Sequence, residues 1–188
     1  MALVVTIQGT DRTSVVKEDT IKVTQIADSY TFTAELTIFD ENGDITITAG
    51  DHTSAVTLVD GATTFFGGYV ANQDIESLEA GSRNLHLQLQ GYGIRVVETL
   101  VASETYSATA DDAIIDDLFD TYLATVDSTT HVAQLDASMD ITFTEMNLAE
   151  CLDAICQQTG GRWYVDNSNA LHYFSAEADA ASFDLSDE

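Results

Sequence analysis

Oxygen-bearing side chains alternate in one short segment, Asp40, Asn42 and Asp44, and Asp51 stands at the twelfth place counted from Asp40. The same alternation supplies the first ligands of the calcium loop in helix–loop–helix proteins. That loop requires glycine at its sixth place, where this chain has Ile45, and the flanking segments are typical of strands. The Asn-Gly pair inside the segment favours a tight hairpin turn, so we interpret the segment as a turn between two strands. Calcium binding at Asp40, Asn42 and Asp44 stays open as an alternative.

A second acidic group has helical spacing. Its members are Asp111, Asp112, Asp116, Asp117 and Asp120. A metal site would need them to converge with ligands from elsewhere in the fold, whereas the solvated face of a helix explains them without any ligand. Two carboxylates can also hydrolyse a glycoside, but among 32 acidic residues the choice of any pair would be arbitrary.

Residues that usually carry nucleophilic, metal or phosphate chemistry are scattered. The four histidines, His52, His86, His131 and His172, show no ligand spacing. The chain has no Gly-x-Ser-x-Gly elbow and no phosphate loop. Cys151 and Cys156 lie five residues apart, on different faces of a helix, which disfavours both a disulfide and a zinc site. We therefore predict no catalytic, cofactor-binding or metal-binding residues, no cofactor and no enzymatic activity.

The charge is extreme for 188 residues: 32 Asp and Glu stand against 6 Lys and Arg, a formal net charge of -26. Clustered cations are what binds nucleic-acid phosphates and anionic membranes, so both classes of partner are disfavoured. An apolar fraction of 45% indicates a folded protein rather than an acidic tail. The sequence has no uninterrupted run of 18 apolar residues, so no membrane span is predicted. The N-terminal segment is typical of a strand rather than of a signal peptide.

The acidic residues are mostly aspartate, by 21 to 11, and lysine occurs only at Lys17 and Lys22. Such a composition on an apolar core resembles proteins of halophilic archaea and their viruses. Molar salt shortens the Debye length to about 3 Å and so screens self-repulsion. We hypothesise that the protein works in high salt.

The first hundred residues alternate with the two-residue period of β-strands. Strands are predicted over 3–7, 20–24, 30–38, 45–48, 54–58, 63–72 and 85–90. Gly67-Gly68 inside a strand pattern indicates a bulge or the close approach of another backbone segment. Short strands in this number and spacing predict a small barrel or sandwich.

The pattern changes near residue 95. Apolar residues on one helix face predict a helix over 110–126, with Thr109 and Asp112 as a capping box. A second helix is predicted over 148–158, capped by Asn147 and Glu150 and ended by a glycine pair. Other predicted elements are strands at 141–143 and 183–185, a loop with a short strand at 127–140, and a hairpin of strands 162–166 and 170–174.

The predicted fold is therefore α+β and mainly β. A small β-barrel or sandwich occupies residues 1–97. An α+β domain with two helices and a C-terminal hairpin occupies residues 98–188.

Four stretches follow one another in a characteristic order: 64–70 (Thr-Phe-Phe-Gly-Gly-Tyr-Val), 85–98, the helix around 113–118, and the strand, helix, glycine pair and aromatic hairpin of 143–174. This order resembles the baseplate-hub, or tail-tip, proteins of tailed bacterial and archaeal viruses, and the last stretch is its most specific part. Members of that family usually continue into a second barrel after the hairpin, a pattern from which this chain departs.

The resemblance implies a structural virion protein whose hub domain is the barrel of residues 1–97. It implies self-association into a ring, a trimer or a hexamer, that connects the tail tube to fibres or spike. The other implied partners are tail proteins of the tube, distal tail and fibre, with no membrane. Genomic DNA would pass through without specific binding, and an acidic bore would prevent sticking. The implied location is the virion tail, after assembly in the host cytoplasm.

Another class of function is compatible with the sequence. The chain could be a secreted β-rich binding module that recognises glycans or a host surface, with Trp163, Tyr164 and Tyr173 as its contact platform. We favour these aromatics as core residues. A hydrolase of unknown type is the third alternative.

Overall fold

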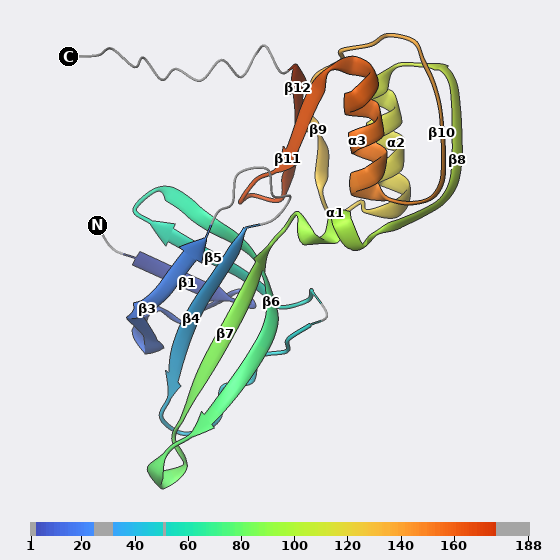
Figure 1. The fold of residues 1–188 in the computed structure, drawn as a ribbon. Helices are drawn as coiled ribbons and strands as arrows, with labels where there is room; N and C mark the ends of the chain where they lie inside the picture. The colour runs from blue at the N-terminus through green and yellow to red at the C-terminus, as the bar shows by residue number, and fades with distance from the viewer. Residues whose placement is uncertain (1–2, 25–31, 51, 176–188) are drawn as a thin grey trace, which may run out of the picture. The chain divides into compact units, whose positions relative to one another are not determined.

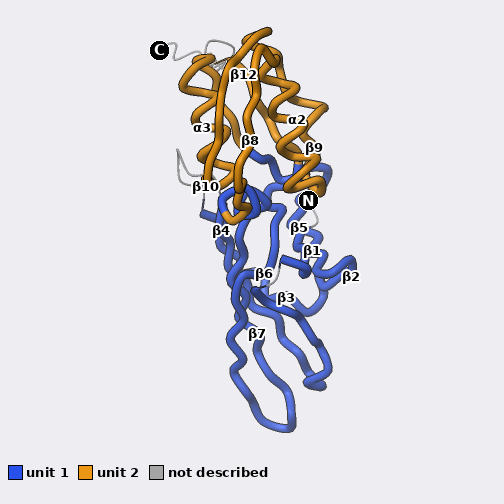
Figure 2. Tube along the Cα trace, turned by 90° about the vertical axis from the view of Figure 1, so that its right-hand side faces the viewer, with its two compact units in different colours: residues 1–97, 165–169 blue, residues 98–164, 170–188 orange. Residues whose placement is uncertain are grey.

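The computed structural model describes residues 3–24, 32–50 and 52–175 (Figure 1). The chain forms two compact units (Figure 2): unit 1 comprises residues 1–97 and 165–169, and unit 2 comprises residues 98–164 and 170–188. Strands dominate, and the two long helices lie in unit 2. The prediction of an α+β fold that is mainly β is confirmed.

Unit 1 is built on a seven-stranded antiparallel sheet with the order β2-β1-β5-β6-β7-β4-β3. Its strands are β1 (Leu3–Ile7), β2 (Thr10–Asp11), β3 (Val16–Thr24), β4 (Thr33–Asp40), β5 (Ala55–Asp60), β6 (Thr63–Ser77) and β7 (Arg83–Gly91). The edge strands β2 and β3 are consecutive in the chain, joined through the 3-10 helix η1 (Thr13–Val15). The sheet must therefore curve until its edges approach, which makes it a partly open barrel. A second 3-10 helix, η2 (Glu79–Gly81), lies between β6 and β7.

The inner face of this sheet carries the core of unit 1. Alternate side chains of β4 and β7 are at most 2% exposed, namely Leu36, Ile38, Leu85, Leu87 and Leu89. They pack in one cluster with apolar residues of β1, β5 and β6. Each such side chain stabilises the fold by about 1.5–3 kcal/mol through removal from water, so the period-two pattern of the sequence directly fixes this face.

The segment after β4 does not form the predicted hairpin. Residues 45–48 pair with no described strand, although Ile45 and Ile47 are buried in the core. Both sides of β4 are already occupied, by β3 and by β7. The alternation at 45–48 therefore reports core burial of an extended segment, and the prediction of a strand there is wrong.

The edge strand β3 contains a large bulge. Residues 18–21 lie opposite a single residue of β4, Leu36, because Lys17 pairs with Thr37 and Lys22 pairs with Glu35. The hydroxyl of Thr20 replaces the missing ladder bond: it accepts from the Thr37 N–H at 2.9 Å. The bulge is thus a hydrogen-bonded structure with a fixed register.

Gly67 and Gly68 lie in β6 where other backbone segments come close, as predicted. A Cβ atom on Gly67 would collide with the carbonyl oxygen of Asn167, and one on Gly68 would collide with that of Gln90. The Gly67 N–H donates to Asn167 Oδ1 at 3.2 Å, and Asn167 Nδ2 donates to the carbonyl of Thr64 at 3.4 Å. Only glycine leaves room for these contacts.

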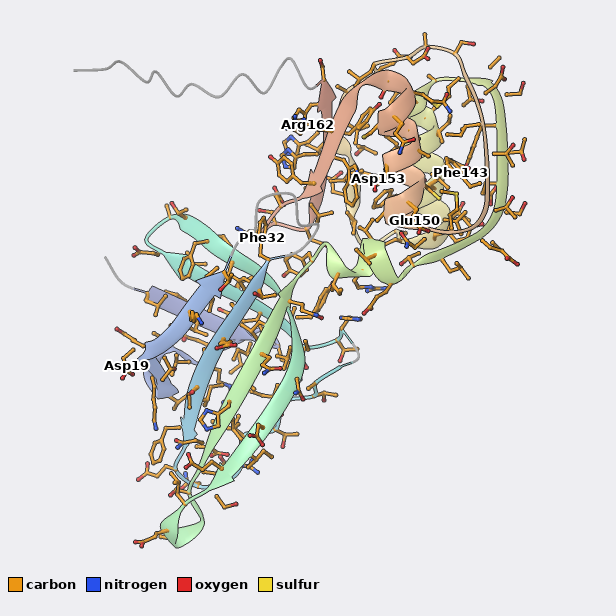
Figure 3. The ribbon with its side chains drawn as sticks, in the orientation of Figure 1. Asp19, Phe32, Phe143, Glu150, Asp153 and Arg162 are labelled. Atoms are coloured by element: carbon orange, nitrogen blue, oxygen red, sulfur yellow. The ribbon has the colours of Figure 1, made fainter. Side chains whose placement is uncertain are left out.

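Unit 2 has three layers (Figure 1). Helices α2 (Asp111–Tyr122) and α3 (Leu148–Thr159) lie between a ribbon of β8 (Leu100–Thr109) with β10 (Met139–Asn147) and a sheet of order β11-β12-β9. That sheet comprises β11 (Gly161–Val165), β12 (Ala170–Ser175) and β9 (Asp127–Val132), with β12 and β9 parallel. Phe143, fully buried, projects from the ribbon toward the helices (Figure 3). The short helix α1 (Ile94–Glu98) follows β7, close to the point where the sequence pattern changes.

The helix ends show one correct and one wrong prediction. Asn147 and Glu150 form the predicted capping box of α3, with bonds of 2.9 and 2.8 Å between each side chain and the other's N–H. The box at Thr109 is wrong, because Ala110 is the N-cap of α2 and no side chain caps it. Thr109 ends β8 instead, and its hydroxyl donates to the carbonyl of Ser107. The strand predicted at 183–185 and residues 30–31 of another lie outside the described residues.

Replacing Gly67 by alanine tests the close approach. We expect Gly67→Ala to lower the free energy of unfolding by about 2–3 kcal/mol, because a backbone carbonyl cannot move aside as a flexible side chain can. Gly61→Ala is the matched control: an added Cβ meets nothing within 4 Å there, and only its φ of +62° is strained, which costs about 1 kcal/mol. Equal losses in urea unfolding would contradict the assignment.

Candidate functional site

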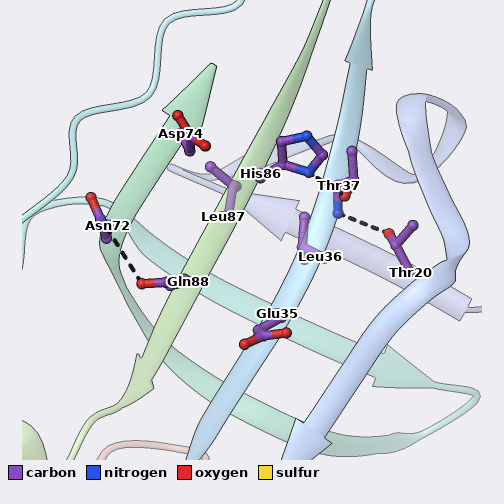
Figure 4. A pocket seen from close by; sticks show the side chains of 9 residues that line it. All are labelled: Thr20, Glu35, Leu36, Thr37, Asn72, Asp74, His86, Leu87 and Gln88. Atoms are coloured by element: carbon purple, nitrogen blue, oxygen red, sulfur yellow. Dashed lines mark hydrogen bonds between the residues drawn. The ribbon is translucent and has the colours of Figure 1, made fainter. Parts of the chain in front are cut away.

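A polar groove of about 370 Å³ lies on the outer face of the unit 1 sheet (Figure 4). Strands β3, β4, β6 and β7 contribute its lining: Thr20, Glu35, Leu36, Thr37, Asn72, Asp74, His86, Leu87 and Gln88. The strand register sets neighbouring side chains in two rows. One row runs Thr37, His86, Asp74, and the other runs Glu35, Gln88, Asn72.

The arrangement around His86 combines a hydroxyl, an imidazole and a carboxylate. Thr37 Oγ1 lies 3.0 Å from His86 Nδ1, and His86 Nε2 lies 3.6 Å from Glu76 Oε2. The pKa of Glu76 is lowered, chiefly by the hydrogen bond that Asn84 donates and to a lesser degree by His86 and Lys17. Sequence reasoning missed this group, since it depends on the register of β7 with β6 and with β4, and β4 lies far from β7 in the chain.

The group resembles the nucleophile, base and acid of a hydrolase, but the surroundings do not suit acyl transfer. Such chemistry requires N–H donors aimed at the developing oxyanion. The N–H of Thr37 already donates to Thr20 Oγ1, and Thr37 is 6% exposed in the middle of a paired strand. We interpret the group as a cross-strand network that orders the outer face of the sheet.

Asp40, the first residue of the calcium-like alternation, is buried and bound by protein donors. Its Oδ2 accepts from Arg83 Nε at 2.8 Å and from the Ile45 N–H at 2.9 Å, and its Oδ1 accepts from the Asp44 N–H at 3.2 Å. Burial opposes ionisation of Asp40, but the bond from Arg83 and the two N–H donors outweigh it and hold the pKa below its usual value. Asp40 thus anchors the irregular segment that follows β4.

Three of the five aspartates of α2 accept hydrogen bonds from other elements, each from different donors. Asp111 is fully buried and accepts from the Leu135 N–H at 3.1 Å and from the Tyr173 hydroxyl at 2.8 Å. Asp116 accepts from Ser128, and Asp117 accepts from Tyr106. In the part of the chain that the structure describes, no three His, Cys, Asp or Glu side chains gather in a group that could hold a metal ion.

The cysteines of α3 are free thiols, Cys151 buried and Cys156 half-buried, in line with the interpretation as small apolar residues. Burial raises the pKa of each thiol to about 12, and the nearby carboxylates of Glu150 and Asp153 add to this. Both thiols therefore remain protonated at neutral pH and are poor nucleophiles.

The aromatic residues of the hairpin do not form one platform. Tyr173 is fully buried, and the Trp163 indole donates to Asp153 on α3 at 2.9 Å. Tyr164 is 42% exposed on the opposite face of the sheet. The proposed contact surface of Trp163, Tyr164 and Tyr173 is therefore wrong as a set, because strand alternation separates its members.

Histidines far apart in the sequence do meet on that opposite face. The rings of His131 and His172 stack at 4.3 Å with an angle of 4°, and His172 stacks on Tyr164 at 4.5 Å with an angle of 5°. Neighbouring positions of β9, β12 and β11 hold the three rings. The parallel pairing of β9 with β12 brings them together, and no local sequence signal indicates it.

Proteins of known structure share the fold of this chain. No protein-family model and no curated protein matches the sequence. Solved structures do match. The 43 kDa tail protein of prophage MuSo2 from Shewanella oneidensis has a TM-score of 0.66 at 13% identity, over 92% of this chain and 54% of that one. A tail protein from Neisseria meningitidis MC58 has a TM-score of 0.64 at 12% identity, over 92% and 50%.

A secretion-system component shares the fold as well. The Escherichia coli c3393 protein, described as structurally similar to the T4 bacteriophage tail proteins gp27 and gp5, has a TM-score of 0.55 at 8% identity over 92% of this chain and 44% of that one. The chain thus has the fold of phage tail proteins and spans about half the length of these structures. The resemblance drawn from the order of sequence segments is confirmed at the level of fold.

The buried pair of Asp40 and Arg83 gives a testable pH dependence. Asp40→Asn should lower the free energy of unfolding at pH 7 by about 2 kcal/mol, because Arg83 loses its buried partner. The folded-state pKa of Asp40 is below the ordinary 3.8, so its contribution is complete above that pH and is lost as the pH falls toward the folded value. Urea unfolding of wild type and variant should therefore converge as the pH falls below 3.8 toward the folded-state pKa.

Glu41→Gln is the control for this measurement, since it removes the neighbouring, exposed carboxylate. We expect a change below about 0.5 kcal/mol for it. A loss for Asp40→Asn that stayed the same in acid would show that packing, and not the charge pair, accounts for the effect.

Proposed function

We propose that this protein is a structural component of a viral tail, at the tail tip or baseplate hub. The observation that carries the proposal is the fold itself, which matches tail proteins over more than nine-tenths of this chain. The proposed role is to form a ring that connects the tail tube to fibres or spike. In this role the protein performs no chemistry, and the tube, distal tail and fibre proteins are its partners.

The surface is consistent with assembly rather than catalysis. Exposed large apolar side chains are spread over both units, including Ile75 at 50%, Leu78 at 40% and Leu100 at 61%. The groove on the unit 1 sheet is polar, and its side chains bond to one another. No helix among the described residues has the length and apolar character to cross a membrane.

Self-association is the first test of the proposal. We expect the purified chain, 20.3 kDa as a monomer, to form a closed trimer or hexamer in light scattering and sedimentation, at moderate or molar salt. Closed symmetric assembly gives one discrete mass that stays constant with rising concentration. A monomer at every salt concentration, or an open-ended series of masses, would contradict the ring.

The bore of such a ring is proposed to carry carboxylates. DNA that must pass without binding is repelled by like charge, and a chain with a net charge of -26 has acidic side chains in excess. A cryo-EM map of intact particles should place this protein around the DNA path with Asp or Glu side chains facing inward. A basic or apolar lining would refute this part of the proposal.

We also propose that the protein functions in concentrated salt, which its net charge of -26 supports. We expect the melting temperature to rise between 0.1 M and 2 M NaCl, because screening removes self-repulsion among the carboxylates. For a chain of this length a gain of about 1 kcal/mol moves the melting temperature by ~2–4 °C. A melting temperature that did not rise would count against a halophilic origin.

A further inference from the structure

The outer face of the three-stranded sheet in unit 2 differs from the rest of that unit. We name it the ring-stack face and define it by Arg162, Tyr164, His172, Phe174 and His131. Trp163, Leu171 and Tyr173 point the other way, toward the helices, so strand alternation turns Arg162, Tyr164, His172 and Phe174 outward. Figure 3 shows Arg162 on β11 and Asp153, the partner of Trp163, on α3.

Three stacked rings form the centre of this face. Because Tyr164, His172 and His131 stack in parallel across three neighbouring strands, they stand upright and direct their edges away from the sheet. Aromatic edges carry the positive part of the ring quadrupole. The Arg162 guanidinium, a group of five N–H donors, lies two positions before Tyr164 on the same face of β11. Phe174 supports the stack by an edge contact with Tyr164, with ring centroids 5.9 Å apart.

This face carries the one cationic side chain of unit 2. Arg162 is the one lysine or arginine in the sequence of unit 2, which otherwise contributes many of the 32 carboxylates. The exposed guanidinium of Arg162, with its five N–H donors, is complementary to carboxylates. A second copy of this acidic chain supplies such carboxylates, so no other kind of partner is needed.

We propose that the ring-stack face docks on a carboxylate-bearing surface of a neighbouring copy, as one of the contacts that close the ring; this rests on the self-association proposed above. The contact is heterologous, since a donor face on one copy meets an acidic face on the next. Repetition of such a contact builds a cyclic assembly when the rotation closes. Arg and Tyr are also the residue types in which interface energy concentrates.

Two variants test the docking in the full chain. Arg162→Glu reverses the charge, and Tyr164→Ala removes an exposed ring without touching the buried side of the sheet. Each should weaken self-association by about tenfold or more in sedimentation, while the monomer of each variant stays folded in circular dichroism. Lys22→Glu is the matched control, because it makes the same change in net charge on β3 of unit 1 and should leave association within about twofold.

Cross-linking identifies what lies on the face. A photoreactive phenylalanine analogue at position 164, in a mixture of isotopically light and heavy chains, should give light–heavy cross-links to an acidic segment of another copy. Cross-links confined within one chain would show that this chain covers its own face and would overturn the proposal. The absence of light–heavy cross-links would overturn it as well.

Two outcomes distinguish a failure of the ring from a failure of this contact alone. A wild-type chain that never self-associates refutes the proposed ring and, with it, this contact. A wild-type ring that forms equally well with Arg162→Glu and Tyr164→Ala refutes the contact alone.

Discussion

Two adjacent positions of β6 have no space for a side chain, and the close packing around this point of unit 1 depends on this. At Gly67 and Gly68 the neighbouring backbone occupies the place of a Cβ atom, from Asn167 on one side and from Gln90 on the other. The same space receives the ring of Tyr92, which makes an edge contact with Tyr69 at 5.1 Å. The glycines therefore do more than relax the strand: they let one strand contact β7, an aromatic pair and the turn at 165–169 at the same place.

Unit 2 depends on a buried polar network instead. Asp111 opens α2, accepts from the loop before β10 and accepts from Tyr173 on β12, while the Tyr173 hydroxyl also bonds Thr159 at the end of α3. Burial raises the pKa of Tyr173, and the neighbouring Asp111 carboxylate adds to this. Because a buried carboxylate is tolerated only when donors satisfy it, the network fixes the relative positions of α2, α3 and β12 within the unit.

Local chemistry made much of this structure predictable. The strands of unit 1, the capping box at Asn147 and the glycines of β6 each have a signal within a few residues. Three features depend on partners distant in the chain and were missed or misread. Strand β8 has weak apolar alternation and exists because β10 pairs with it. Residues 45–48 look like a strand but find β4 already paired on both sides. The rings of His131 and His172 meet only through a parallel pairing of β9 with β12.

Strand β3, which contains the bulge, is an edge of the unit 1 sheet. An unpaired strand edge is a template on which other polypeptides can add in register, the first step toward fibrillar aggregates. Here four residues stand opposite one, and they include Glu18 and Asp19 between Lys17 and Lys22. A strand of another polypeptide that paired with this edge would lose its register at the bulge, and it would bury the charges of Glu18 and Asp19. The bulge and its charges therefore protect this edge of the sheet against the addition of a strand from another polypeptide.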